Sequence, residues 1–219
     1  MLKNLFPLPL WIEQIDPNTY NKNQIIEDVY HNYNIDPLRD KFGDNFYVPC
    51  MMHHENRDHH NEKFKTLNYR MLKVVYQNAI NRFLEYNFDV TGLSNEKYYC
   101  DLDMSNYTAM TKNNHMGTHE HASSQFVGVH YVQFDKELHN GIRFWNPNNQ
   151  YVFCKVFESY DYFVNDSIHN KFYVPDIKED TLVIFPGYLE HDVPPQPDID
   201  SDKLRISIAF NFNLVRRDV

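Results

Sequence analysis

The stretch Thr118–Val132, THEHASSQFVGVHYV, decides the fold that we expect for this chain. It places His119 and His121 one residue apart, ahead of an alternating apolar run that begins at Phe126. Successive side chains of a strand point to opposite faces of a sheet, so two histidines at this spacing face the same way if the segment is extended. The stretch therefore predicts a strand that presents two imidazoles together.

Two later segments carry polar residues that suit the same site. Residues 180–191, DTLVIFPGYLEH, form an apolar run that ends on His191. Residues 203–212, KLRISIAFNF, place Arg205 and Ser207 two positions apart, so that both side chains share one face of a strand. An Arg-x-Ser pair alone is a weak signal, but its place after the histidines makes the whole pattern more specific.

This set of residues predicts a metal site beside a carboxylate site. Neutral imidazole suits Fe(II), Zn, Cu and Ni, and non-haem iron oxygenases use only three protein ligands, which leaves positions open for a cosubstrate. A guanidinium can hold a carboxylate through two parallel charge-assisted bonds. An arginine inside an apolar strand needs a buried partner, which favours an anionic ligand for Arg205 over an ion pair with Asp200 or Asp202. The candidate metal ligands are His119, His121 and His191.

The rest of the chain shows helical spacing in its first third and strand patterns after it. Residues 5–15 read as a strand near a sheet edge, and residues 23–35 and 62–88 have the apolar spacing of amphipathic helices. Short strands are expected at 98–103, 107–111, 127–134, 142–145, 151–156, 171–174, 181–185 and 204–212.

One domain is expected over residues 1–219, because a chain of 219 residues falls within the range of single β domains. Residues 1–97 would supply helical support and the N-terminal strand, and residues 98–219 the core. About eight evenly spaced strands after a helical third predict an α+β fold, in which an all-β core with flanking helices forms a cupin-like double-stranded β-helix, or jelly roll.

Composition and charge exclude several classes of function. The net charge is −9, with 30 acidic and 21 basic residues, so we expect no nucleic-acid partner. No apolar run reaches the ~20 residues of a membrane span, and the start of the sequence lacks the pattern of a signal peptide. The three cysteines share no short spacing, which is typical of reduced thiols. These features favour a soluble, cytoplasmic protein, in the host cytoplasm if the chain is viral.

The remaining histidines are expected to have no catalytic role. MMHHENRDHH, residues 51–60, holds a histidine cluster, and His54 and Asp58 could meet on a helix as part of a second metal site. Adjacent histidines point in different directions, however, so a solvated loop is the favoured interpretation. His115 and His130 are assigned to solvent or packing.

Five motifs follow one another in an order that is typical of one enzyme family. They are LFPLPLW, HEH before VGVHYV, GIRFWNP, FPGYLEHDV and RISIAFN. In this order they resemble the Fe(II)- and 2-oxoglutarate-dependent dioxygenases, in particular prolyl-hydroxylase-like oxygenases of marine bacteria and phages. The resemblance covers most of residues 100–213 and, loosely, the N-terminal third.

The resemblance implies a role for each candidate residue. The three metal ligands of Fe(II) would be His119, His121 and His191. Arg205 would pair with the distal carboxylate of 2-oxoglutarate, and Ser207 and Tyr131 would help to hold it. The sequence departs from the wider superfamily at His121, where an aspartate or glutamate is usual. Glu120 is the nearest carboxylate, but on an extended strand it would face away from the metal.

The resemblance also implies an activity: decarboxylation of 2-oxoglutarate to succinate, coupled to hydroxylation of a small-molecule or peptidyl substrate. One alternative is a three-histidine cupin-type dioxygenase that does not use 2-oxoglutarate, in which Arg205 binds the carboxylate of the substrate itself. Another is a non-enzymatic jelly-roll binding protein. Further alternatives concern single residues: His121 could act through a water instead of binding the metal, and Tyr131 could be a core aromatic.

Overall fold

The computed structural model describes residues 8–37, 51–53, 63–88, 98–147 and 172–216. Its elements are β1 (Trp11–Gln14), the short 3-10 helix η1 (Pro17–Thr19), α1 (Lys22–Ile35), β2 (Met51–His53), α2 (Arg70–Phe88), β3 (Tyr98–Met110), β4 (Met116–His119), β5 (Phe126–Gln133), β6 (Arg143–Trp145), β7 (Phe172–Tyr173), β8 (Thr181–Pro186), β9 (His191–Val193) and β10 (Arg205–Arg216). The strand expected at 151–156 lies outside the described residues.

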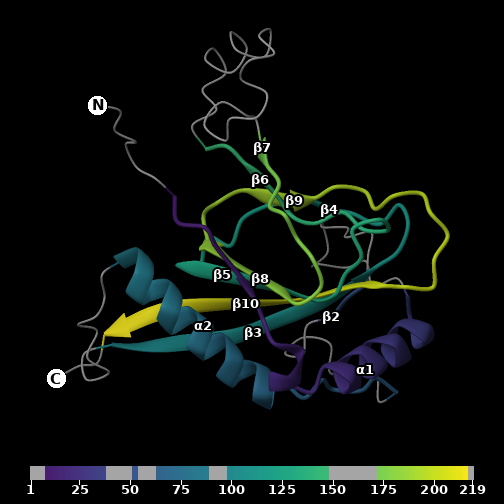
Figure 1. Cartoon of the computed structure of the whole chain (residues 1–219), viewed down its shortest axis with the longest axis horizontal. Helices are drawn as coiled ribbons and strands as arrows, with labels where there is room; N and C mark the ends of the chain where they lie inside the picture. Colours follow the sequence, from purple (N-terminus) through teal and green to yellow (C-terminus); the bar gives the residue numbers. More distant parts are fainter. Residues whose placement is uncertain (1–7, 38–50, 54–62, 89–97, 148–171, 217–219) are drawn as a thin grey trace, which may run out of the picture.

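The strands form two antiparallel sheets. The larger has six strands in the order β1-β8-β5-β10-β3-β2, and the smaller has four in the order β4-β9-β6-β7. Figure 1 shows the smaller sheet on one side of the larger and both α-helices on the other. The predicted double-stranded β-helix with flanking helices is confirmed.

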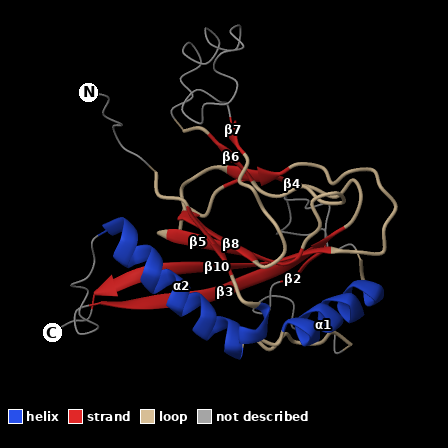
Figure 2. Cartoon of the chain, viewed as in Figure 1, coloured by secondary structure: helices blue, strands red, loops and turns tan. Residues whose placement is uncertain are grey.

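Both helices lie against one face of the larger sheet (Figure 2). α2 packs on that face through an apolar stripe. In α2, fully buried side chains recur at spacings of three and four residues, at Leu72, Tyr76, Ala79, Ile80 and Phe83. They pack with the even-numbered residues of β10, which are Ile206, Ile208, Phe210 and Phe212. Apolar residues at a spacing of about 3.6 form one face of the helix, and burial of that face against the sheet stabilises the helix there.

The helix expected at 62–88 begins only at Arg70. Side-chain bonds to the backbone hold the preceding segment in a non-helical form. Asn32 of α1 donates from Nδ2 to the Lys65 carbonyl at 2.9 Å and accepts from the Lys65 amide at 2.8 Å. The Asn68 side chain then accepts from the Arg70 amide at 3.1 Å, as residues ahead of a helix start commonly do. These long-range contacts outweigh the apolar spacing of residues 62–69.

The two short strands expected at 98–103 and 107–111 form the single strand β3. It pairs with β10 along its length, from Arg205 opposite Met110 to Arg216 opposite Tyr98. Between these ends β3 has one residue more than β10, which forms a bulge. The bulge lies where polar residues interrupt the apolar alternation of the sequence, so the strand continues through them.

The stretch THEHASSQFVGVHYV is divided between the two sheets. β4 ends at His119 and pairs with β9, whereas β5 begins at Phe126 and pairs with β8 and β10. A turn at Ala122 and Ser123 connects them. The expectation that His121 lies on the same extended strand as His119 is therefore wrong, because the chain must turn here to change sheets.

The core between the sheets is apolar. It contains Val127 and Tyr131 from β5, Val183 and Phe185 from β8, Phe144 from β6, and Phe134, Ile142, Ile177 and Leu189 from the connecting segments. Neither helix among the described residues combines the length and apolar character needed to cross a membrane.

A buried polar network connects the larger sheet to the helices. His130 of β5 is fully buried, and its Nδ1 lies 2.9 Å from the Tyr76 hydroxyl. Asp180 accepts hydrogen bonds from the Tyr20 hydroxyl at 2.5 Å and from Lys22 Nζ at 2.6 Å, and its Oδ1 lies 3.9 Å from His130 Nε2. Burial, together with the nearby Lys22 charge, lowers the pKa of His130 to about 3.

The close contact at Gly128 predicts that Gly128→Ala destabilises the fold. A Cβ atom at Gly128 would lie 2.0 Å from Cζ of Phe210, inside the core beneath α2. We expect a loss of about 1–3 kcal/mol in the free energy of unfolding, the usual cost of overpacking. Denaturant unfolding measures it. Gly117→Ala is the matched control, because no atom lies within 4 Å of its added Cβ. Equal stability of the two variants would contradict the predicted packing.

The buried His130 predicts that stability falls with pH below about 6.5. The pKa of His130 is about 6.5 in the unfolded chain and about 3 in the folded protein. Between these two pH values the unfolded chain binds a proton at His130 and the folded protein does not. The free energy of unfolding should therefore fall by up to roughly 1.4 kcal/mol per pH unit as pH decreases. Urea unfolding at two pH values, about 7 and about 5, should show a larger loss for wild type than for His130→Gln. Equal losses would exclude His130 as the source.

Candidate metal centre

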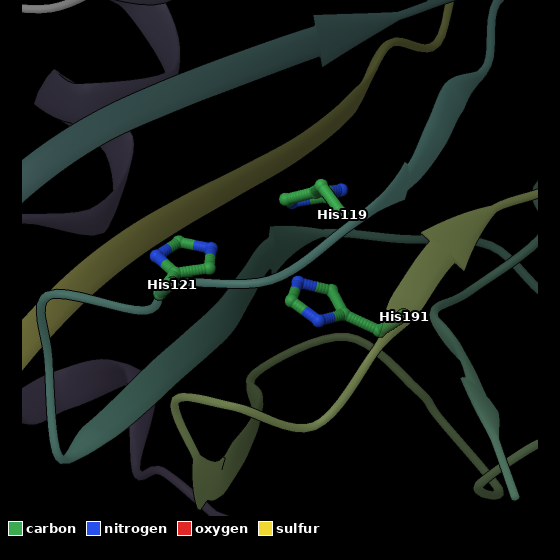
Figure 3. Close-up of side chains that lie close together, drawn as sticks. All are labelled: His119, His121 and His191. Carbon is green, nitrogen blue, oxygen red and sulfur yellow. The ribbon is translucent and has the colours of Figure 1, made fainter. Parts of the chain in front are cut away.

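Three histidines from two segments of the chain meet in one cluster (Figure 3). The ligand nitrogens of His119, His121 and His191 all lie within 4.8 Å of one another. His119 ends β4 and pairs directly with His191, the first residue of β9. Their ring centroids are 4.2 Å apart, and the centroid of His121 is 5.4 Å from each. The structure thus brings together the three histidines that the sequence singles out.

The turn after β8 brings the third imidazole to the other two. The His121 amide donates to the Gly187 carbonyl at 2.7 Å, and the Gly187 amide donates to the Gln125 carbonyl at 2.9 Å. A Cβ atom at Gly187 would lie 2.1 Å from the Ser124 carbonyl oxygen. Only glycine permits this approach of the two backbones, and the approach holds His121 beside the segment that leads to His191.

The same ring nitrogen of each histidine is hydrogen-bonded to an oxygen. Nδ1 lies 2.8 Å from the Gly117 carbonyl in His119, 2.8 Å from the Leu189 carbonyl in His191, and 2.8 Å from Oδ1 of Asn211 in His121. A carbonyl oxygen can only accept, so Nδ1 carries the proton and Nε2 keeps its lone pair. This tautomer leaves Nε2 free to bind a metal.

Burial keeps the imidazoles neutral. It is the largest cause that lowers the pKa of His119, His121 and His191. The pKa of His191, the most deeply buried, falls to about 3, and the nearby His119 lowers it further than burial alone would. Neutral imidazoles bind a cation without first releasing a proton, so the donor set fits a divalent transition metal.

No carboxylate joins the cluster among the described residues. Glu120 is exposed, as expected for the residue between the two histidines. Asp192 follows His191 but pairs with Arg143, whose Nε and Nη2 donate to its carboxylate at 2.8 and 2.6 Å. Among the described residues the cluster therefore consists of three neutral donors, with a histidine at position 121 where the wider superfamily usually has a carboxylate.

Arg205 lies inside the protein at the start of β10, only 1% exposed. Its Nε donates to the Asn140 carbonyl at 2.9 Å, and its Nη1 lies 3.3 Å from Ser207 Oγ and 3.5 Å from Met110 Sδ. The guanidinium carbon stands 4.9 Å from the centre of the Tyr131 ring. Arg205, Ser207 and Tyr131, which the sequence analysis grouped, are thus neighbours.

No described carboxylate forms an ion pair with Arg205. Of the two aspartates considered from the sequence, Asp200 pairs with Lys112, and Asp202 forms no ion pair with Arg205. A buried charge without a counter-ion is costly, which makes this an environment suited to an anionic ligand. The Tyr131 hydroxyl accepts from the Ile142 amide at 2.9 Å, which leaves its O–H proton available to an acceptor. Burial raises the pKa of Tyr131, so the phenol keeps that proton.

The two parts of the site lie on facing sheets. β4 and β9 of the smaller sheet carry His119 and His191, and β10 of the larger sheet carries Arg205. Met110, which contacts Arg205, also packs with Met116 of β4 and Val193 of β9. This arrangement places a cation site and an anion site within one double-stranded β-helix.

Sequence reasoning missed the residues that orient the site. Asn211, which bonds His121, has the same odd-numbered parity on β10 as Arg205 and Ser207, so strand alternation could have identified it. Gly187 and Asn140 lie in connecting segments and carried no comparable signal. Of the 51–60 histidine cluster, only residues 51–53 are described, as β2, and the question of a second metal site lies outside the described residues.

The fold is similar to those of several solved oxygenases. A prolyl-4-hydroxylase of Pseudomonas putida is 10% identical, with 95% of this chain and 92% of that chain covered and a TM-score of 0.52. A prolyl hydroxylase of Trichoplax adhaerens, solved with a peptide fragment of hypoxia inducible factor, is 10% identical, with 93% and 82% covered and a TM-score of 0.50. At these identities the similarity shows the fold alone.

A 2OG-Fe(II) oxygenase-family oxidoreductase of Burkholderia pseudomallei is 14% identical, with 68% of this chain covered and a TM-score of 0.41. The chain spans 60% of the length of that protein. No curated protein matches the sequence.

A protein-family comparison covers the segment that holds the site. Residues 105–211 match the family described as "Putative 2OG-Fe(II) oxygenase". The matched segment includes the three clustered histidines and the buried arginine of β10. Over this segment the chain is similar to the 2OG-Fe(II) oxygenase family, whose name refers to Fe(II) and 2-oxoglutarate.

Proposed function

We propose that this protein is an oxygenase that hydroxylates its substrate and converts 2-oxoglutarate to succinate. The Fe(II) ligands in this proposal are His119, His121 and His191. Arg205 binds the distal carboxylate of 2-oxoglutarate, with Ser207 and Tyr131 as further hydrogen-bond donors. The observation that carries the proposal is a buried guanidinium that has no carboxylate partner among the described residues, in the same β-helix as three clustered imidazoles whose Nδ1 atoms are already hydrogen-bonded.

The overall reaction balances with one molecule each of substrate, O₂ and 2-oxoglutarate. One oxygen atom enters a substrate C–H bond to give an alcohol, and the other enters succinate as carbon dioxide is lost. Bound Fe(II) supplies the redox chemistry that activates O₂. The protein supplies the positions of the reactants and the exclusion of water.

Each group of the chain has a definite task in this reaction. Arg205 and Tyr131 hold the far carboxylate of the cosubstrate, which leaves its oxo-acid end to reach the metal. Phe144 and Phe185 pack beside His191, with ring centroids 6.2 and 4.8 Å from its own, and shield that side of the cluster from water. Three neutral ligands also leave the metal one unit more positive than a site with a carboxylate, which favours binding of the anionic cosubstrate.

The substrate is proposed to be a small molecule or a peptide, with no nucleic-acid partner, in keeping with the net charge of −9. Two structural neighbours are prolyl hydroxylases, so a proline-containing peptide is the first class to test. The cytoplasmic location favoured by the sequence stays a prediction.

Release of succinate from 2-oxoglutarate tests the proposal. The measurement uses the purified chain with Fe(II), O₂ and 2-oxoglutarate. Succinate that depends on added Fe(II) supports the proposal. A three-histidine dioxygenase that does not use 2-oxoglutarate would bind the metal and release no succinate.

We expect Arg205→Ala to weaken 2-oxoglutarate binding roughly 30-fold or more, because truncating one partner of a buried charge pair costs about 2–5 kcal/mol. Metal affinity should stay within about twofold of wild type, since Arg205 contacts none of the three histidines in the hydrogen bonds described. Anaerobic titration of the metal-loaded protein measures both. Arg82→Ala, at an exposed arginine paired with Glu13, is the control. Equal loss of metal and cosubstrate would show that the assigned role is wrong.

His121→Asp should retain or improve metal binding, because it restores the carboxylate that is usual in the superfamily and adds a negative charge beside the cation. His121→Ala should weaken binding, since it removes the donor without replacement. Competition titration with Fe(II) or Co(II) compares the two variants. Complete loss of the metal in His121→Asp would count against the alignment of His121 with the carboxylate position of the superfamily, and unchanged binding in His121→Ala would exclude His121 from the ligand set.

A further inference from the structure

The side chain of Gln196 is a buried bridge close to Arg205. Gln196 is 2% exposed and lies three residues after the end of β9. Its Oε1 accepts from the Asn140 amide at 3.0 Å, and its Nε2 donates to the Asn140 carbonyl at 3.3 Å and to the Pro194 carbonyl at 3.2 Å. The glutamine side chain thus bonds both the backbone N–H and the backbone carbonyl of Asn140, as a neighbouring strand would.

The carbonyl that Gln196 holds is the one that holds Arg205. Arg205 Nε donates to the Asn140 carbonyl at 2.9 Å. Asn140 is fixed a second time by its own side chain, whose Nδ2 donates to the Pro195 carbonyl at 2.8 Å. The position of the arginine fork therefore depends on a peptide group clamped by the 194–196 segment.

The backbone of Gln196 extends the bridge to the metal side. Its amide donates to the Asn114 carbonyl at 2.8 Å, and its carbonyl accepts from the Asn113 amide at 3.0 Å. Residues 113 and 114 lead into β4, which ends on His119, whereas Gln196 itself follows the strand that begins with His191. One buried residue thus joins the segments next to two of the histidines to the loop that orients Arg205.

We infer that Gln196 is a positioning residue for 2-oxoglutarate, acting through the Asn140 carbonyl on the orientation of Arg205. The inference rests on the proposed role of Arg205. A guanidinium recognises a carboxylate through a planar, two-bond geometry, so an error in its orientation weakens binding even when its charge is unchanged. Gln196 touches neither cosubstrate nor metal in this scheme, so its loss acts on affinity for the cosubstrate and leaves the metal site intact.

Gln196→Met tests the inference, because methionine keeps much of the volume and removes all three side-chain bonds. We expect the Kd and KM for 2-oxoglutarate to rise about tenfold, since one or two neutral hydrogen bonds contribute about that factor. Metal affinity and the rate at saturating 2-oxoglutarate should change less than about twofold. Asn32→Leu is the matched control, because Asn32 is also a fully buried amide that bonds a loop backbone, but it lies on the helix side of the larger sheet.

The outcomes separate this inference from the proposed function. A rise in KM for 2-oxoglutarate in Gln196→Met and none in Asn32→Leu supports it. Unchanged affinity in Gln196→Met, when Arg205→Ala weakens binding, overturns the inference and leaves the proposed function standing. If Arg205→Ala also leaves binding unchanged, both fail. Should Gln196→Met not fold, Gln196→Asn decides the matter, because it keeps a buried amide but shortens its reach to the Asn140 backbone by one carbon, and unchanged 2-oxoglutarate affinity there overturns the inference.

Discussion

The alternation of side chains along β10 is the constraint on which the rest of the structure depends. Even-numbered residues of this strand, such as Ile208 and Phe210, are buried against the helices, and odd-numbered residues face the smaller sheet. β10 also pairs with β3 on one side and with β5 on the other, so it lies inside the larger sheet. Its odd face carries the buried Arg205 and Ser207 and the partly buried Asn211, while its even face supplies the apolar contacts that hold α2.

Two buried ionisable residues, His130 and Arg205, differ in whether they are charged inside the protein. His130 lies in a network with Tyr76 and near the Asp180 carboxylate, and it stays neutral because burial lowers its pKa to about 3. Arg205 cannot lose its charge, and the described residues offer it only uncharged partners. The first group belongs to the framework. Arg205 is a buried positive charge that a bound anion would stabilise, and this is the physical basis of the proposed cosubstrate site.

Backbone geometry holds the three histidines of the candidate metal centre together. His119 and His191 are neighbours because β4 pairs with β9, and His121 joins them because the turn at Gly187 meets the turn before β5. Hydrogen bonds from Nδ1 then select the same tautomer in each ring. In the proposed function, the three ligands carry no charge, so the metal and Arg205 on the facing sheet would attract the anionic cosubstrate.

The sequence by itself determined the chemistry and the order of the parts: the types of the candidate ligands, the shared face of Arg205 and Ser207, and the succession of helices and strands. These depend on local periodicity, which residues within a few positions of each other define. Only the tertiary structure decided that His121 sits on a turn, that α2 begins at Arg70, and that Arg205 has no described counter-ion. Each of those outcomes arises from contacts between segments far apart in the chain, such as Asn32 with Lys65 or His121 with Gly187, and local patterns carry no record of them.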